Sequence, residues 1–156
     1  MVIEIASKPG IRVKVEIEAG ALKRVSLEPS KTFSLECSSK DTKVVKPVID
    51  WLKAYAKGKA PVFPLPLSLP SSKASFRDTV LRFLQNIPHG TVLTYKEVAE
   101  GVKNPRAARA VGNICRGNLF PLIIPCHRVI RADGKMGNYT PNPKLKIELL
   151  RFEGVK

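Results

Sequence analysis

The sequence predicts two small domains of different class: an α+β domain with a small antiparallel sheet and a helix, then a mostly helical domain containing a helix-turn-helix. Three observations predict this. Apolar and polar residues alternate in residues 1–36, prolines crowd residues 58–75, and the remaining chain has helical spacing and capping residues. With 156 residues, 44% of them apolar, the chain can bury two small cores. We therefore expect domains at residues 1–70, ending in a proline-rich linker, and 71–156.

The first 36 residues are expected to form the sheet. Val13, Val15 and Ile17 alternate with charged residues, which is the period of two of a strand with one buried face. Gly10 and Gly20 lie at the expected turns, and short turns favour antiparallel pairing. Weaker strand candidates are residues 2–5, 22–27 and 32–35.

A helix is expected at residues 42–57, where apolar residues recur every three or four positions between lysines. Proline is tolerated in a first helical turn, so this helix is predicted to begin at Pro47, and Gly58 suits its end. Four prolines within ten residues then make an extended, semi-rigid segment, in which we place the domain boundary. They are Pro61, Pro64, Pro66 and Pro70.

Capping signals predict the helices of the second half. Thr94 and Glu97 have the spacing of a capping box, and both Asn104-Pro105 and Asn142-Pro143 place a capping residue before a proline. The helices at residues 95–100 and 105–116, joined by four residues, match a helix-turn-helix. The expected helices are residues 76–86, 95–100, 105–116 and 143–152.

The helix expected at residues 105–116 has two different faces. At 100° per residue, small apolar side chains gather on one side, with Cys115 near their centre, where we expect a buried, inert thiol. The other side is a polar arc that could bind an anion, although an ordinary solvated face has the same pattern. The arc consists of Arg106, Arg109, Asn113 and Arg116.

The net charge of +14 favours an anionic partner. The segment from Gly101 to Ala132 has no acidic residue and six basic ones, five of which are arginine. Arginine binds phosphates through two parallel hydrogen bonds and stacks on bases, so nucleic acid is favoured over a membrane surface. A lysine-rich surface that serves solubility or thermal stability would also explain the charge.

Other classes of protein fit the sequence less well. No stretch approaches the roughly 20 apolar residues of a membrane span, and the N-terminus lacks the pattern of a secretory signal. We therefore expect no membrane association and a cytoplasmic location. The three cysteines include no CxxC pair and only two histidines are present, so no structural metal site is expected.

The segment Pro125-Cys126-His127-Arg128 has the residue types of a reactive thiol. A thiolate forms most readily beside a base or a positive charge, and both follow Cys126. Neighbouring side chains on an extended segment point apart, so Cys126 and His127 can cooperate only at a turn, which Pro125 favours, or through a water molecule. Chemistry alone leaves a second interpretation open, a buried cysteine beside a structural histidine.

These four residues resemble the active-site signature of the O6-alkylguanine-DNA alkyltransferases. The resemblance runs from Phe76 to Glu153 with nearly no gaps, whereas the first 70 residues match only in layout. It implies a ribonuclease-H-like N-terminal domain and a helix-turn-helix in the second. The further matching segments are residues 104–112, 116–118, 137–139 and 152–154.

The resemblance implies direct, irreversible transfer of an alkyl group from O6-alkylguanine in double-stranded DNA, and less well from O4-alkylthymine, to Cys126. The protein would be a methylated-DNA-[protein]-cysteine S-methyltransferase that is consumed in one turnover, without a cofactor, and we expect it to act as a monomer. Further catalytic roles are implied for three residues. His127 would deprotonate the thiol through a water molecule, Glu153 would orient His127, and Asn118 would brace the turn that carries the cysteine.

Because the target atom is buried in duplex DNA, the base has to be rotated out, and the resemblance implies residues for this step. Arg109 would fill the space left by the base, and Tyr95 would crowd the neighbouring phosphate and donate a hydrogen bond to the base. Tyr95 is also explained as a half-buried aromatic, and Asn104 as a helix cap. The other expected DNA-binding residues are Arg77, Lys96, Asn104 and Arg106; the expected walls of the guanine pocket are Val129, Tyr139 and Thr140.

The sequence departs from some members of the family. Cys37 is alone among the first 70 residues, which also lack histidine, so neither an N-terminal zinc site nor a disulfide within that domain is expected. Two other functions remain compatible with the sequence. They are a non-catalytic helix-turn-helix protein that binds DNA damage, and a Cys–His hydrolase.

Overall fold

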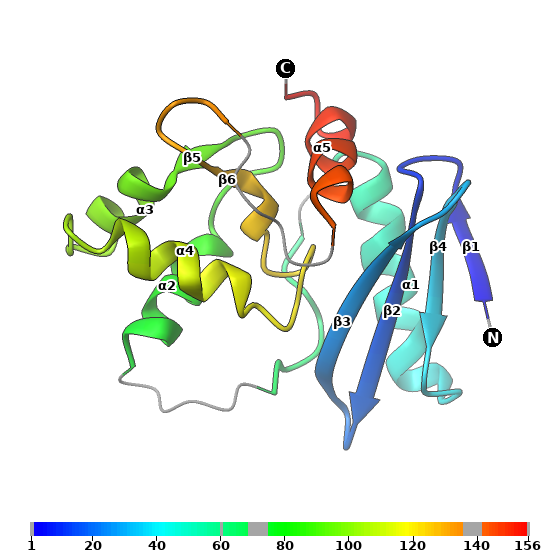
Figure 1. Ribbon diagram of the computed structural model, residues 1–156. Helices are drawn as coiled ribbons and strands as arrows, with labels where there is room; N and C mark the ends of the chain where they lie inside the picture. Colours follow the sequence, from blue (N-terminus) through cyan, green and yellow to red (C-terminus); the bar gives the residue numbers. More distant parts are fainter. Residues whose placement is uncertain (1, 60, 69–74, 136–141, 156) are drawn as a thin grey trace. The chain divides into compact units, whose positions relative to one another are not determined.

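The computed structural model describes residues 2–59, 61–68, 75–135 and 142–155 (Figure 1). The chain divides into two compact units, Met1–Leu69 and Pro70–Lys156. Each unit has its own buried apolar core. Among the helices of these ranges, none is long and apolar enough to cross a membrane.

The sheet of the first unit is mixed. Its strands are β1 (Val2–Ala6), β2 (Ile11–Glu18), β3 (Ala21–Pro29) and β4 (Phe33–Cys37), in the order β1-β4-β2-β3. A tight turn joins β2 to β3, and its residues Ala19 and Gly20 both have the positive φ angles, 51° and 77°, that such hairpins require. The four strands predicted from the alternating pattern are therefore confirmed.

The prediction of a wholly antiparallel sheet is wrong for one pair of strands. β4 pairs with β2 in parallel, with Val13 opposite Leu35, although β1 and β3 pair antiparallel with their neighbours. The physical reason lies in burial: Phe33, Ser34 and Leu35 are all fully buried, which suits an inner strand rather than the edge beside β3.

Helix α1 (Thr42–Ala56) lies along one face of this sheet (Figure 1). Its buried stripe includes Leu52 and Tyr55, and the Tyr55 ring packs on Phe33 of β4. The predicted start at Pro47 is wrong, because Asp41 accepts a hydrogen bond from the amide of Lys43 and starts the helix at Thr42. Pro47 lies inside the helix, where it removes one backbone hydrogen bond without ending it.

Helices dominate the second unit, with a two-stranded parallel sheet beside them. Ser75 caps the first helix, Asn142 caps the last, and Thr94 and Glu97 form the predicted capping box. In the small sheet Leu93 pairs with Val129 and Thr94 with Ile130, so Tyr95 begins its helix beside the strand that follows Cys126. The elements are α2 (Phe76–Leu84), β5 (Leu93–Thr94), α3 (Tyr95–Gly101), α4 (Ala108–Arg116), the 3₁₀ turn η1 (Cys126–Arg128), β6 (Val129–Ile130) and α5 (Pro143–Phe152).

Helix α4 begins three residues later than the sequence predicts. The amide of Ala107 donates to the carbonyl of Asn104, so Asn104-Pro105 opens a turn and not the helix. Arg106 therefore lies outside the helix, and the expected arc is reduced to three exposed residues, Arg109, Asn113 and Arg116. On the opposite side Cys115 is buried as predicted, and burial raises the pKa of its thiol to about 12.

Candidate functional site

Cys126 is the first residue of the 3₁₀ turn η1 and is 4% exposed. The amide of Cys126 donates to the carbonyl of Ile124 at 2.8 Å, and the amide of Arg128 donates to that of Pro125 at 3.0 Å. The chain therefore turns tightly at Pro125, as its sequence predicts. Leu122, with a φ of 75°, bends the buried segment that leads to this turn.

Asn118 holds both ends of this segment. Its side-chain amide donates to the carbonyl of Ile124 at 2.9 Å and to Sγ of Cys126 at 3.1 Å. Its side-chain oxygen accepts a hydrogen bond from the amide of Phe120 at 2.9 Å. The Asn118 side chain thus holds the amide of Phe120 at the start of this segment, the carbonyl of Ile124 near its end, and the thiol of Cys126.

A buried carboxylate stands behind His127. Nε2 of His127 lies 2.7 Å from Oε2 of Glu153, and neither side chain is exposed. Arg128 donates to both carboxylate oxygens of Glu153, from Nε at 2.8 Å and from Nη2 at 3.0 Å. The amide of Gly90 adds a hydrogen bond to Oε1 at 3.2 Å. Glu153 is therefore held by a histidine, an arginine and a backbone donor.

These contacts set the protonation of the site. Burial alone would raise the pKa of Glu153, but the hydrogen bonds from His127 and Arg128 hold it well below the ordinary value of 4.5, so Glu153 is ionised. Burial also lowers the pKa of His127 below 6.5, although Glu153 opposes this effect, so the ring is neutral.

It follows that Nε2 of His127 carries the hydrogen that is donated to Glu153, and Nδ1 carries none. Within the described ranges, this buried Nδ1 has no hydrogen-bond partner. The site therefore offers a proton acceptor on the side of the ring that faces away from the carboxylate. A neutral imidazole fixed in one tautomer by a carboxylate is the arrangement of a general base.

Lys146 is a buried lysine that the sequence pattern alone did not indicate as part of the site. It is 1% exposed, and its Nζ donates to the carbonyl of Val129 at 2.6 Å and lies 5.9 Å from the centre of the Tyr95 ring. Burial lowers its pKa, an effect that the nearby thiols of Cys126 and Cys115 oppose. The sequence feature that could have indicated its burial is its position. Lys146 falls in the buried stripe of α5, beside Leu145, Leu149 and Leu150.

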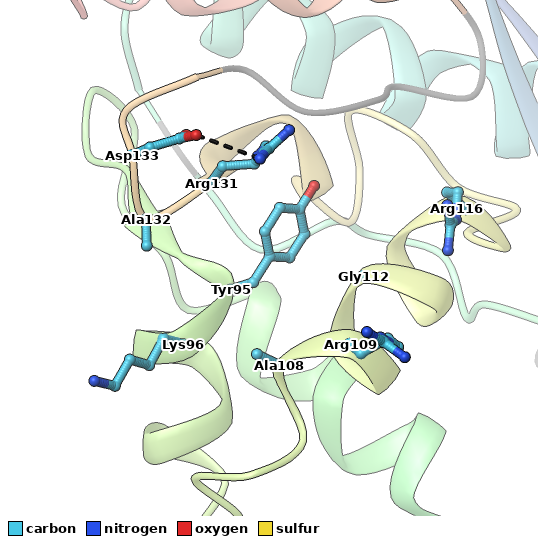
Figure 2. A pocket seen from close by; sticks show the side chains of 9 residues that line it. All are labelled: Tyr95, Lys96, Ala108, Arg109, Gly112, Arg116, Arg131, Ala132 and Asp133. Atoms are coloured by element: carbon cyan, nitrogen blue, oxygen red, sulfur yellow. Dashed lines mark ion pairs between the residues drawn. The ribbon is translucent and has the colours of Figure 1, made fainter.

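A pocket of about 560 Å³ opens beside Tyr95 in the second unit. Figure 2 shows the Tyr95 ring between α4, with Arg109 and Arg116, and the segment of Arg131 and Asp133. Burial raises the pKa of the Tyr95 hydroxyl to about 12, so it keeps its proton and can donate a hydrogen bond at neutral pH. The lining residues are Tyr95, Lys96, Ala108, Arg109, Gly112, Arg116, Arg131, Ala132 and Asp133.

Residues 75–155, which contain the 3₁₀ turn, the His127–Glu153 pair and the pocket, match the family model described as the DNA-binding domain of 6-O-methylguanine DNA methyltransferase. The chain belongs to this family. The methylated-DNA–protein-cysteine methyltransferase of Methanothermobacter thermautotrophicus is 38% identical over 132 residues, which cover 84% of this chain and 72% of that protein. The protein of the same name from Methanosarcina barkeri is 42% identical over 102 residues, or 65% of this chain.

The matched region spans 63% of the length of the Methanosarcina barkeri protein. Among solved structures, the chain resembles Mycobacterium tuberculosis OGT in complex with DNA, with a TM-score of 0.70 and 29% identity over 92% of each chain. The fold of the chain is therefore that of the family, a small mixed sheet with helices.

The structure brings four residues of the expected methyltransferase site together: Asn118 touches Cys126, and His127 touches Glu153. Arg128, which the sequence analysis counted only as a nearby charge, is the second partner of Glu153. The predicted pocket residue Val129 is buried in β6, with its carbonyl bonded to Lys146. Tyr139 and Thr140 lie outside the described residues.

The expected DNA-binding residues divide into two groups. Tyr95, Lys96 and Arg109 line the pocket, whereas Asn104 and Arg106 are exposed in the turn before α4 and do not. Arg77 points elsewhere: its Nη2 donates to the carbonyl of Gly117 at 2.8 Å, at the end of α4. Arg77 therefore contacts the residue that precedes Asn118 in the sequence.

In the part of the chain that is described, no group of three or more His, Cys, Asp or Glu side chains could hold a metal ion. Cys37, Cys115 and Cys126 are all buried and outside disulfide bonds.

Proposed function

We propose that the protein repairs DNA by direct transfer of an alkyl group from O6-alkylguanine, and less well from O4-alkylthymine, to Cys126. The observation that carries the proposal is the buried His127–Glu153 pair, which leaves a proton-accepting Nδ1 in the same 3₁₀ turn as the thiol. Membership of the methyltransferase family supports the reaction class.

The proposed transfer begins with the proton of the thiol. His127 accepts it at Nδ1 through a bridging water molecule, and ionised Glu153 stabilises the imidazolium that forms. The amide of Asn118, which donates to Sγ, stabilises the thiolate.

The thiolate then attacks the alkyl carbon, and the bond between this carbon and O6 breaks. Its electron pair stays on the base, which takes up a proton and becomes guanine. Sulfur and the alkyl group are the only partners in the new bond, so no cofactor is required. Because water does not displace a thioether, each molecule reacts once and a single copy suffices, which supports a monomer.

Double-stranded DNA is the proposed partner, and a cytoplasmic location is part of the proposal. Helices α3 and α4 would act as a helix-turn-helix, with Arg109 filling the place of the rotated base and Tyr95 beside its phosphate. The pocket between these residues supports this placement. Lys96, Asn104, Arg106 and Arg77 would contact the DNA backbone, and Val129, Tyr139 and Thr140 would line the guanine pocket. We also assign the first unit to the ribonuclease-H-like class, on its mixed sheet and single long helix.

Stoichiometric incubation with a duplex that contains one O6-methylguanine tests the proposal. Peptide mass mapping should find one added methyl group per protein, on the peptide that contains Cys126, and none in Cys126→Ala. Cys115→Ala is the matched control, since this buried thiol should leave the yield unchanged.

Two other outcomes would replace the proposal. Lesion binding without any mass change, equally strong in Cys126→Ala, would indicate a non-catalytic DNA-damage-binding protein. Release of product over many turnovers per thiol would indicate a hydrolase.

A further inference from the structure

The pocket beside Tyr95 has two cationic walls. One is formed by α3 and α4, which contribute Lys96, Arg109 and Arg116. The other contains Arg131, and Figure 2 shows it across the Tyr95 ring from Arg109. Asp133 is the acidic residue among the residues that line this pocket. The two walls therefore suit an anionic ligand. The proposed function assigns no role to Arg131.

Arg131 is held in a fixed position relative to Tyr95. The parallel register pairs Leu93 with Val129 and Thr94 with Ile130, so Tyr95 and Arg131 are the next residues along the two strands. The amide of Arg131 also donates to the carbonyl of Lys135 at 2.9 Å, which closes the turn that follows. The Arg131 side chain thus projects from a rigid backbone at the edge of the pocket.

Asp133 forms an ion pair with the guanidinium of Arg131. Oδ2 of Asp133 lies 3.3 Å from Nη2 of Arg131, and the two side chains are 44% and 57% exposed. The other carboxylate oxygen accepts a hydrogen bond from the amide of Lys135 at 3.0 Å, which fixes Asp133 in the turn. Such an exposed pair contributes little to stability, so a stronger anion can replace the carboxylate.

We propose that Arg131 binds a backbone phosphate beside the rotated nucleotide, and that Asp133 competes with this phosphate for the guanidinium in the free protein. The inference rests on the proposed function, because it needs DNA in this pocket. The guanidinium meets Asp133 through one oxygen at 3.3 Å, since the other oxygen accepts from the amide of Lys135. A phosphate can offer two oxygens to the planar guanidinium, so it displaces the aspartate. Asp133 then lies near the phosphate and weakens the complex, which limits affinity for undamaged DNA.

Two substitutions test the roles of Arg131 and Asp133 separately. Arg131→Gln removes the charge but keeps a shorter side chain that can donate hydrogen bonds. Asp133→Asn removes the negative charge, and its side-chain oxygen can still accept from the amide of Lys135, so the turn is kept. The matched control is the exposed pair Lys46 and Asp50 on α1, whose charged atoms are also 3.3 Å apart. Lys46→Gln and Asp50→Asn change the net charge equally but lie in the other unit.

Affinity for an undamaged duplex should be measured by fluorescence anisotropy over a range of salt concentrations. Arg131→Gln should weaken binding about fivefold and lower the slope of log K against log salt by about one, because one phosphate contact is lost. Asp133→Asn should tighten binding about threefold, and this gain should largely vanish in the double variant. The rate of reaction with free O6-benzylguanine, which has no phosphate, should change much less than the duplex affinity in the Arg131 and Asp133 variants.

Three results would overturn the inference: an unchanged salt slope in Arg131→Gln, a gain in Asp133→Asn no larger than in Asp50→Asn, or an equal loss of the O6-benzylguanine rate. The test also separates the phosphate site from the proposed function. If the wild-type protein transfers no alkyl group but its DNA affinity responds as described, the proposed function fails and the phosphate site stands. If the wild type repairs DNA and the variants match their α1 controls, only the phosphate site fails.

Discussion

Nε2 of His127 and Oε2 of Glu153 lie 2.7 Å apart with no exposed side-chain surface on either residue. The same carboxylate holds Arg128 through two hydrogen bonds. Glu153 therefore has two tasks, because it selects the tautomer of the histidine and neutralises a buried arginine. These tasks are separable by experiment.

Glu153→Gln should harm both reactivity and stability. The neutral amide leaves the guanidinium of Arg128 buried without an anion, which should cost about 3–5 kcal/mol in urea unfolding. It also stabilises the imidazolium less, so the rate with free O6-benzylguanine should fall at least about tenfold. Glu100→Gln, on the exposed side of α3, is the control. A folded variant that reacts within twofold of the wild type would remove Glu153 from the proposed mechanism.

The pH dependence of stability follows from two lowered pKa values. In the folded state the pKa of His127 lies below 6.5 because of burial, and that of Glu153 lies below 4.5 because His127 and Arg128 outweigh burial. As the pH falls, the unfolded chain takes up protons that the folded chain refuses, first at the histidine and then at the glutamate. Stability should therefore be full above about pH 6.5 and be lost progressively in acid.

Urea midpoints from about pH 8 to about pH 4 test this dependence. His127→Gln should flatten the first part of the decline. His89→Gln is the comparison for His127→Gln. Burial also lowers the pKa of His89, but this residue is only partly buried, so His89→Gln should flatten the decline less. A wild-type midpoint that rises in acid would contradict the assignment.

Asn118→Ala should slow alkyl transfer without changing DNA affinity. The substitution removes the hydrogen bonds to the carbonyl of Ile124, the thiol of Cys126 and the amide of Phe120. Unpaired buried backbone groups should cost about 1–3 kcal/mol of stability. The rate with O6-benzylguanine should be compared at equal folded fraction with Asn86→Ala, whose side-chain amide donates to the carbonyl of Arg82 in α2. Equal rates in the two variants would contradict a role for Asn118 in holding the thiol.

Arg77 should affect the reaction even without DNA. Its guanidinium donates to the carbonyl of Gly117, the residue before Asn118, so Arg77→Ala should loosen the start of the active-site segment. We expect about 1–2 kcal/mol of lost stability and a slower reaction with O6-benzylguanine, partly restored by Arg77→Lys. Arg151→Ala, an exposed arginine of α5, is the control. Loss of duplex repair alone would indicate that Arg77 serves only as a phosphate contact.

Local patterns predicted the secondary structure well. The alternation of Val13, Val15 and Ile17 and the capping signals at Thr94 and Asn142 lead directly to β2, α3 and α5. Strand pairing was not predictable in this way, because whether β4 lies beside β2 or β3 depends on which faces are buried by distant residues. The start of α4 was missed for a related reason, since Asn104-Pro105 serves a turn and a helix equally well.

The candidate site was predictable in part. Cys126 and His127 are adjacent in sequence, and family resemblance pointed to Asn118 and Glu153, which the structure places within hydrogen-bond distance of them. Their catalytic roles stay predictions. The position of Lys146 in the apolar stripe of α5 hints at burial, but a lysine in an amphipathic helix is normally solvated. Only packing shows that its Nζ reaches the carbonyl of Val129.

Two glycines of the second unit give opposite predictions. A Cβ atom at Gly101, the last residue of α3, would overlap the ring of Phe83 on α2, so Gly101→Ala should destabilise the protein by about 1–3 kcal/mol. At Gly112, inside α4, the nearest atom of the Tyr95 ring would lie at 3.9 Å, an ordinary contact. Gly112→Ala should therefore be neutral, or stabilising by up to about 1 kcal/mol through helix propensity.

Urea unfolding of both glycine variants gives the comparison, with Phe83→Leu as the test of cause. A smaller side chain at position 83 should remove most of the cost of Gly101→Ala, because the two substitutions act on one contact. Additive effects would show that the close approach of α2 and α3 at Gly101 does not set the cost. Since Tyr95 begins α3, a relieved contact should also restore any loss of duplex repair that Gly101→Ala causes.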